Sequence, residues 1–130
     1  MVGAQKSLHR TTVGTHHFLL FRTSLTTAGT MPLDTPIDLS RIATPSYIQA
    51  GREDHIAPPE SVWKLTRHLR GDWTFLLAGS GHIAGVVNPP SSKKYGYWTN
   101  PQVGDTLEEF IAGAEQHEGS WWNHWFEWLK

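Results

Sequence analysis

The fold is decided by residues 46–82, which read SYIQAGREDHIAPPESVWKLTRHLRGDWTFLLAGSGH. Residues 46–50 are typical of a short strand, and residues 73–78 predict a second strand whose faces are both covered, because polar residues hardly interrupt it. Between them, Pro58 and Pro59 suit the first turn of a helix, where a missing N–H costs little. Apolar residues then recur at helical spacing up to Gly71. Two strands joined by a helix are usually parallel with a right-handed crossover, so the segment predicts an α/β fold.

Two chemically useful side chains follow these two strands. Asp54 lies in the loop after the first strand, and His82 lies in the loop after the second. Loops at the carboxyl ends of neighbouring parallel strands gather at one edge of the sheet, where ligands commonly bind. We therefore expect the side chains of Asp54 and His82 to lie close enough for a hydrogen bond, directly or through one water molecule.

A histidine held by a carboxylate can take a proton from a nucleophile and later return it. The order strand, Asp54, helix, strand, His82 matches the last two members of an α/β-hydrolase triad, in which the nucleophile precedes both. No serine here has glycine two positions before it and two positions after it. A plainer interpretation is that Asp54 caps the turn that follows it and that His82 is an ordinary loop histidine.

Composition narrows the classes of function. The chain has 130 residues, the size of one small domain, and its net charge of -1 gives no electrostatic case for binding nucleic acid or anionic lipid. Cysteine is absent, which excludes disulfides, thiolate zinc sites and a cysteine nucleophile within this sequence. The eight histidines show no strong metal-ligand spacing, so no metal is expected. No apolar run approaches a membrane span and the first ten residues lack a signal peptide core, so we expect a cytoplasmic protein.

The rest of the chain gives weaker signals. Residues 1–14 predict an arm without regular structure, residues 18–25 a short amphipathic helix, and residues 27–45 a connector. Thr106 is suited to cap a helix that begins at Leu107. The tail is rich in tryptophan, and its spacing predicts a helix with one aromatic face that docks on the sheet. Residues 88–94 read as loop, and the loop aromatics that follow are expected to line or cover a substrate channel: Tyr95, Tyr97 and Trp98.

Several stretches together resemble a known family. Residues 51–58, GREDHIAP, resemble the aspartate motif of the polyhydroxyalkanoate synthases, the bacterial polyester polymerases, and residues 79–90, GSGHIAGVVNPP, resemble their histidine motif. Residues 36–40, 97–100 and 119–122, with Trp125 and Trp128 after them, are similar to further blocks of that family. The resemblance runs from about His17 to the end, and it is greatest to the short-chain type of synthase.

The resemblance implies a C-terminal part of an α/β-hydrolase fold, with parallel strands, a crossover helix and C-terminal helices. It implies that residues 15–130 are a fragment of the catalytic domain, preceded by an unmatched arm at 1–14. Asp54 and His82 would be the aspartate and histidine of a Cys-His-Asp triad. The family's cysteine lies in a G-x-C-x-G elbow upstream, which this sequence lacks. The chain alone is therefore expected to be inactive.

The implied reaction transfers an (R)-3-hydroxyacyl group from coenzyme A to a cysteine and then to a growing polyester, with release of coenzyme A. His82 would be the general base, and Asp54 would orient it or activate the incoming hydroxyl. Coenzyme A enters as part of the substrate, so no cofactor is implied. The expected partners are the thioester, the polyester, and a second copy, a synthase subunit or a granule surface. The alternatives are a fragment of a serine-dependent esterase or depolymerase, and a non-catalytic remnant that binds a synthase or a granule.

Two strands rarely form a stable sheet without further packing. We therefore expect an open sheet edge and an uncovered apolar face, with association or partial folding as the result. The side chains expected to be exposed are Tyr47, Ile48, Phe75, Leu76 and Leu77.

Overall fold

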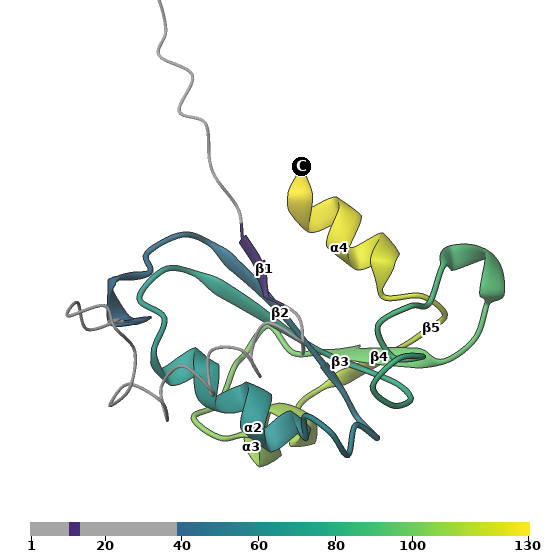
Figure 1. Ribbon diagram of the computed structural model, residues 1–130, viewed down its shortest axis with the longest axis horizontal. Helices are drawn as coiled ribbons and strands as arrows, with labels where there is room; N and C mark the ends of the chain where they lie inside the picture. Colours follow the sequence, from purple (N-terminus) through teal and green to yellow (C-terminus); the bar gives the residue numbers. More distant parts are fainter. Residues whose placement is uncertain (1–10, 14–38) are drawn as a thin grey trace, which may run out of the picture.

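A mixed five-stranded sheet organises the chain (Figure 1). The structure is a computed structural model that describes residues 11–13 and 39–130. The strands lie side by side in their sequence order: β1 (Thr11–Val13), β2 (Ser46–Gly51), β3 (Trp73–Ala78), β4 (Gly96–Thr99) and β5 (Glu115–Glu118). The first three are parallel, whereas β4 is antiparallel to β3 and β5 is antiparallel to β4.

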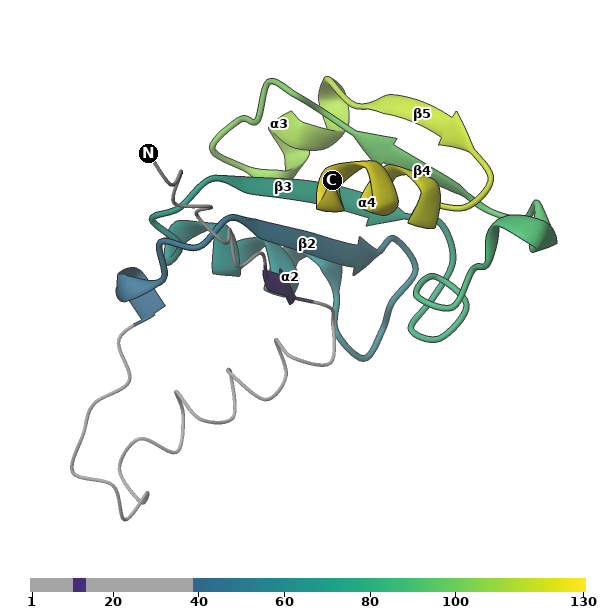
Figure 2. The same cartoon turned by 90° about the horizontal axis from the view of Figure 1, so that it is seen from above.

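Short helices cover both faces of this sheet. They are α2 (Pro59–Trp63), α3 (Leu107–Ala112) and α4 (Trp122–Leu129), with single 3-10 turns at η1 (Leu39–Arg41), η2 (Lys64–Arg67) and η3 (Pro90–Ser92). Figures 1 and 2 show α2 and α3 on one face of the sheet and α4 on the other. Within residues 11–13 and 39–130, no helix is both long enough and apolar enough to cross a bilayer.

The predicted strand–helix–strand unit is confirmed. Strands β2 and β3 pair in parallel, with Gly51 opposite Ala78 at their carboxyl ends, and α2 starts at Pro59. The crossover helix is shorter than its apolar spacing predicts, because it passes into the 3-10 turn η2 at Lys64. Gly71 allows the backbone after η2 to approach the backbone at Ala43 closely, since a Cβ at position 71 would lie 2.4 Å from the carbonyl oxygen of Ala43.

The alternation of side chains along β2 and β3 divides the core in two. Toward α2 and α3, Ile48, Phe75 and Leu77 pack with Trp63 and Phe110. Toward α4, the opposite face forms a second cluster of Tyr47, Leu76, Ala78 and Trp121, against which Trp122, Trp125 and Trp128 pack. The predicted docking of an aromatic helix face on the sheet is thus confirmed, although Leu129 remains 43% exposed.

The expectation of an uncovered apolar face is wrong. The five side chains named for exposure are at most 2% exposed: Tyr47, Ile48, Phe75, Leu76 and Leu77. The reason is that α2 with α3 covers one face, α4 covers the other, and β1 and β4 pair with the outer edges of β2 and β3.

Three local predictions also need correction. Tyr97 and Trp98 lie in β4, not in a loop, because they pair with β3 and pack toward opposite faces of the sheet. Residues 115–118 form a strand that no apolar alternation predicts, and residues 11–13 form β1 inside the segment predicted to lack regular structure. Thr106 caps α3 as predicted, accepting a hydrogen bond from the amide of Glu109. The helix predicted at 18–25 lies outside the described residues.

Candidate active site

The loops after β2 and β3 are tied to each other at the carboxyl edge of the sheet. The amide of Arg52 donates to the carbonyl of Ala78 at 2.8 Å, and the amide of Glu53 donates to the carbonyl of Ser80 at 3.1 Å. These bonds continue the strand pairing beyond its last registered residues. They place the Asp54 loop and the His82 loop side by side, as the topology predicts.

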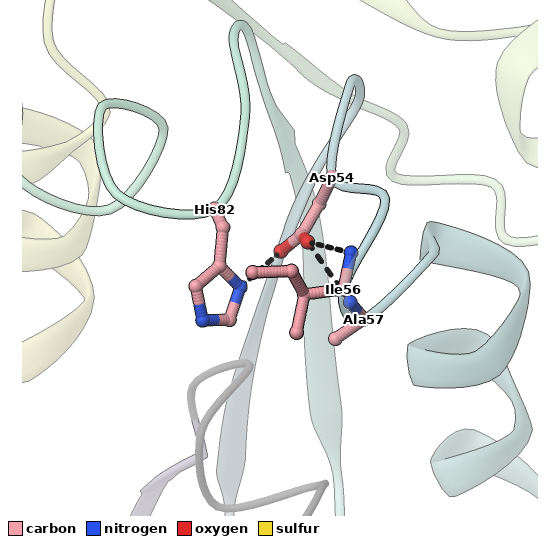
Figure 3. Close-up of polar contacts among 4 residues, drawn as sticks. All are labelled: Asp54, Ile56, Ala57 and His82. Atoms are coloured by element: carbon pink, nitrogen blue, oxygen red, sulfur yellow. Dashed lines mark hydrogen bonds and ion pairs between the residues drawn. The ribbon is translucent and has the colours of Figure 1, made fainter.

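Both carboxylate oxygens of Asp54 accept hydrogen bonds (Figure 3). Its Oδ1 accepts from the amides of Ile56 and Ala57, each at 2.9 Å, and its Oδ2 lies 2.9 Å from Nδ1 of His82. The Asp54 side chain is 0% exposed. A buried carboxylate needs such partners, since an unpaired one would carry a large desolvation cost.

Asp54 contacts His82 through the ring nitrogen Nδ1. Because an ionised carboxylate can only accept, Nδ1 carries the proton that is shared with Asp54, and the neutral ring then has its basic lone pair on Nε2. Figure 3 shows Nε2 on the side of the ring turned away from Asp54. The His82 side chain is 15% exposed. This geometry suits a general base whose protonated form the carboxylate would stabilise.

The loop between β3 and His82 turns sharply. Ser80 has φ of 74°, in the left-handed region that L-residues rarely adopt. Gly85 follows in a helical turn and donates its amide to the carbonyl of Gly81 at 2.8 Å. A Cβ on Gly85 would meet that same carbonyl oxygen at 2.7 Å, so glycine is required there by the closeness of the backbone.

The expected contact between Asp54 and His82 and the expected cap by Asp54 are both present. Oδ1 caps the turn that follows, and Oδ2 reaches His82, so one carboxylate serves both purposes. The prediction that Asp54 caps the following turn did not name the donors, which are the amides of Ile56 and Ala57. An aspartate followed by a turn and then by Pro58 is a recognisable signal for such a cap.

The chain is similar in sequence to part of several known proteins. The chain is 45% identical over 94 residues to the poly(3-hydroxyalkanoate) polymerase subunit PhaC of Cupriavidus necator. It is also 45% identical over 95 residues to the poly(3-hydroxyalkanoate) polymerase of Methylorubrum extorquens, and 45% identical over 94 residues to the PhaC subunit of Rhizobium meliloti. Each match covers 72% of this chain.

The chain is a homologue of part of the poly(3-hydroxyalkanoate) polymerases. It spans about a sixth of the length of these relatives, 16%, 16% and 15% respectively. The resemblance to the polyhydroxyalkanoate synthases is confirmed as sequence similarity to part of these polymerases. No protein-family model matches the sequence.

A second polar cluster in this chain lies between the sheet and α4, away from Asp54 and His82. The Tyr47 hydroxyl and Nδ1 of His124 are 2.8 Å apart, and Tyr97 stacks on His117. Burial, with a smaller contribution from Tyr97, raises the pKa of Tyr47, so this phenol stays protonated. Burial, and then the charge of His117, lowers the pKa of His124.

Two hollows lie beside this cluster, with volumes of about 420 and 520 Å³. Both are lined by His124 and Glu127, and neither is lined by Asp54 or His82. Among the described residues, no group of three or more His, Asp or Glu side chains is arranged to hold a metal ion.

Proposed function

We propose that the polymerase homologue carries the histidine and aspartate of a Cys-His-Asp site for polyester synthesis. The observation that carries this proposal is the contact between Nδ1 of His82 and Oδ2 of Asp54 at 2.9 Å, where two adjacent parallel strands end. This pair occurs in a chain 45% identical to poly(3-hydroxyalkanoate) polymerases. The corresponding fold is the C-terminal part of an α/β-hydrolase, with residues 15–130 as the fragment of its catalytic domain.

The proposed substrate is an (R)-3-hydroxyacyl thioester of coenzyme A. Nε2 of His82 takes the proton from a cysteine thiol, which has to come from another part of the polymerase because this sequence has no cysteine. The thiolate attacks the thioester carbonyl, the carbon–sulfur bond to coenzyme A breaks, and the imidazolium returns the proton to the departing sulfur. The hydroxyl of the next unit, or of the growing chain, then attacks the cysteine thioester and gives its proton to Nε2 of His82. The carbon–sulfur bond to the cysteine breaks, and the imidazolium returns that proton to the departing cysteine sulfur.

Asp54 keeps the imidazole in the tautomer that has its lone pair on Nε2. The bond to Oδ2 would also stabilise the imidazolium formed during each transfer. Coenzyme A arrives and leaves as part of the substrate, so the reaction as proposed calls for no metal and no bound cofactor. The proposed location is the cytoplasm, at the surface of polyester granules and beside synthase subunits.

A split-polymerase assay tests this function. The chain is mixed with a polymerase portion that contains the cysteine elbow and stops before the aspartate motif, and coenzyme A release from 3-hydroxybutyryl-coenzyme A is followed. Release is expected from the mixture, and not from the chain alone. His82→Ala and Asp54→Asn are expected to abolish it.

The matched control is His68→Ala, which removes an exposed histidine at the end of η2. It is expected to leave the release of coenzyme A unchanged. Release from the mixture that persists in His82→Ala would show that His82 is not the base. Release by the chain alone that disappears in His82→Ala would show that it uses a nucleophile other than cysteine, as the serine hydrolase alternative requires.

A further inference from the structure

Three consecutive side chains at the N-terminal end of α4 donate hydrogen bonds to the backbone that follows His82. Nε1 of Trp121 donates to the carbonyl of Gly85 at 2.8 Å, and Nε1 of Trp122 donates to the carbonyl of Val86 at 3.0 Å. The hydroxyl of Ser120 donates to the carbonyl of Asn88. These contacts join segments that are 32 to 36 residues apart in the sequence.

The carbonyls that accept these bonds lie at the end of a single helical turn. Within that turn, the amide of Gly85 donates to Gly81, and the amides of Val86 and Val87 donate to Ile83. The last carbonyls of a helical segment have no amide ahead of them to bind. Pro89 and Pro90 follow shortly and cannot donate, so the chain cannot supply these partners by continuing the helix. The carbonyl of Val86 accepts one hydrogen bond from the amide of Asn88 at 3.2 Å, and the two indole groups supply further donors to Gly85 and Val86.

Trp121 is itself held against the sheet. It is 6% exposed, and its ring stacks on Tyr47 of β2 with 6.2 Å between centroids. A rigid connection therefore runs from β2 through the Trp121 ring to the carbonyl of Gly85. Since the bond from Gly85 to Gly81 spans His82, this connection fixes the turn that carries the imidazole.

We propose that Trp121 and Trp122 are positioning residues for His82, and this inference rests on the proposed function. Asp54 holds one nitrogen of the ring, which sets the tautomer but does not fix where the backbone places the ring. The two indole N–H groups fix the turn, and so they fix the direction in which Nε2 meets a thiol. Misplacement of a catalytic group by about 1 Å can cost about a hundredfold in rate, so such support matters for transfer.

The test uses the full chain with Trp121→Phe and Trp122→Phe, separately and together. Phenylalanine keeps an aromatic ring but removes the indole N–H. Two readouts are followed by NMR: the downfield resonance of the His82 Nδ1 proton, and hydrogen exchange at the amides of Gly85, Val86 and Val87. We expect exchange about tenfold faster for each lost bond, given the usual strength of one hydrogen bond. We also expect the Nδ1 proton resonance to broaden or shift.

The matched control is Trp63→Phe. Trp63 is also buried, and its indole nitrogen has no hydrogen-bond partner among the described residues. Trp63→Phe also loses packing, so its exchange rates are corrected for its lower free energy of unfolding. After that correction, both readouts should match those of the unmodified chain. Trp122 is less buried than Trp121, so Trp122→Phe keeps the test available if the Trp121 variant folds poorly.

The outcomes separate the inference from the function on which it rests. Unchanged readouts in both variants would overturn the inference, and so would faster exchange with an unchanged His82 resonance, which would indicate a structural cap alone. Asp54→Asn provides the reference, because it should remove the resonance if the pair exists. If the unmodified chain has no resonance sensitive to Asp54→Asn, the pair fails, and both the proposed function and this inference fail with it.

Discussion

At the scale of single residues, the two oxygens of Asp54 have different partners, so two substitutions can separate their roles. Asparagine retains a carbonyl oxygen for the amides of Ile56 and Ala57 but replaces Oδ2 with an N–H₂ group that cannot accept from His82. Alanine removes both oxygens. We expect Asp54→Ala to lower the free energy of unfolding by about 1–3 kcal/mol more than Asp54→Asn does, because it leaves two amides without an acceptor.

Urea denaturation of the two variants measures this difference. The exposed Asp105 provides a control, since Asp105→Ala removes a carboxylate at the surface and should change stability by less than about 0.5 kcal/mol. Equal losses for Asp54→Ala and Asp54→Asn would mean that the bonds to Oδ1 contribute little.

Gly85 is a second residue at which adding a single carbon atom is expected to change the stability of the chain. A methyl group there would lie 2.7 Å from the carbonyl oxygen of Gly81, which belongs to the same turn as His82. Gly85→Ala is therefore expected to lower stability by about 1–3 kcal/mol, as overpacking usually does. Ile83→Ala changes a side chain of the same turn that is 73% exposed, and it should have little effect. A thermal melt that gives the same midpoint for both variants would contradict the steric argument.

At the scale of elements, the docking of α4 depends on a histidine that favours its neutral form. Burial and then His117 lower the pKa of His124 in the folded chain, whereas an unfolded histidine titrates near 6.5. As pH falls below about 6.5, the unfolded chain gains a proton that folded His124 does not accept. The stability that depends on His124 is therefore complete above the pKa of the unfolded histidine. It is lost as the pH falls toward the lowered pKa of His124 in the folded chain.

His124→Asn tests this pH dependence, since asparagine carries no titratable group. Stability measured by urea denaturation should fall less steeply between pH 7 and pH 5 in this variant than in the unmodified chain. His68→Asn, at an exposed position, should retain the original slope. Parallel profiles for all three proteins would show that His124 does not couple folding to pH.

The elements predicted well from the sequence are those with a strong local signal. Buried apolar runs predicted β2 and β3, prolines predicted the start of α2, and Thr106 predicted the start of α3. Strand β5 could not be predicted in this way, because three of its four residues are exposed polar groups and its pairing comes from β4.

The candidate site was predictable to a similar degree. Topology placed Asp54 beside His82, because both follow parallel strands of one unit. The bonds from Trp121 and Trp122 to the His82 turn could not be inferred, since they join indole groups to main-chain carbonyls 36 residues away. Periodicity places these rings on a helix, and it says nothing about which carbonyl they reach.

At the scale of the whole molecule, the two clusters of the core share one pair of strands. Ile48 and Phe75 face α2 and α3, whereas Tyr47 and Leu76 face α4, so each strand contributes to both clusters. Loss of either helix layer would expose one face of β2 and β3. Each large side chain that is uncovered costs about 1.5–3 kcal/mol, and a domain has only about 5–15 kcal/mol of stability. Neither cluster should therefore persist without the other.

We accordingly expect the chain to unfold in one cooperative transition. Near-UV circular dichroism reports on the tryptophans, which include Trp63 in one cluster and Trp121 in the other, and far-UV circular dichroism reports on the strands and helices. The two signals should change together on heating. Trp63→Phe, which alters the cluster on the α2 side, should lower the midpoint of both signals equally. A near-UV transition that precedes the far-UV one would contradict this expectation and would indicate that α4 and its aromatic face separate from the sheet before the strands do.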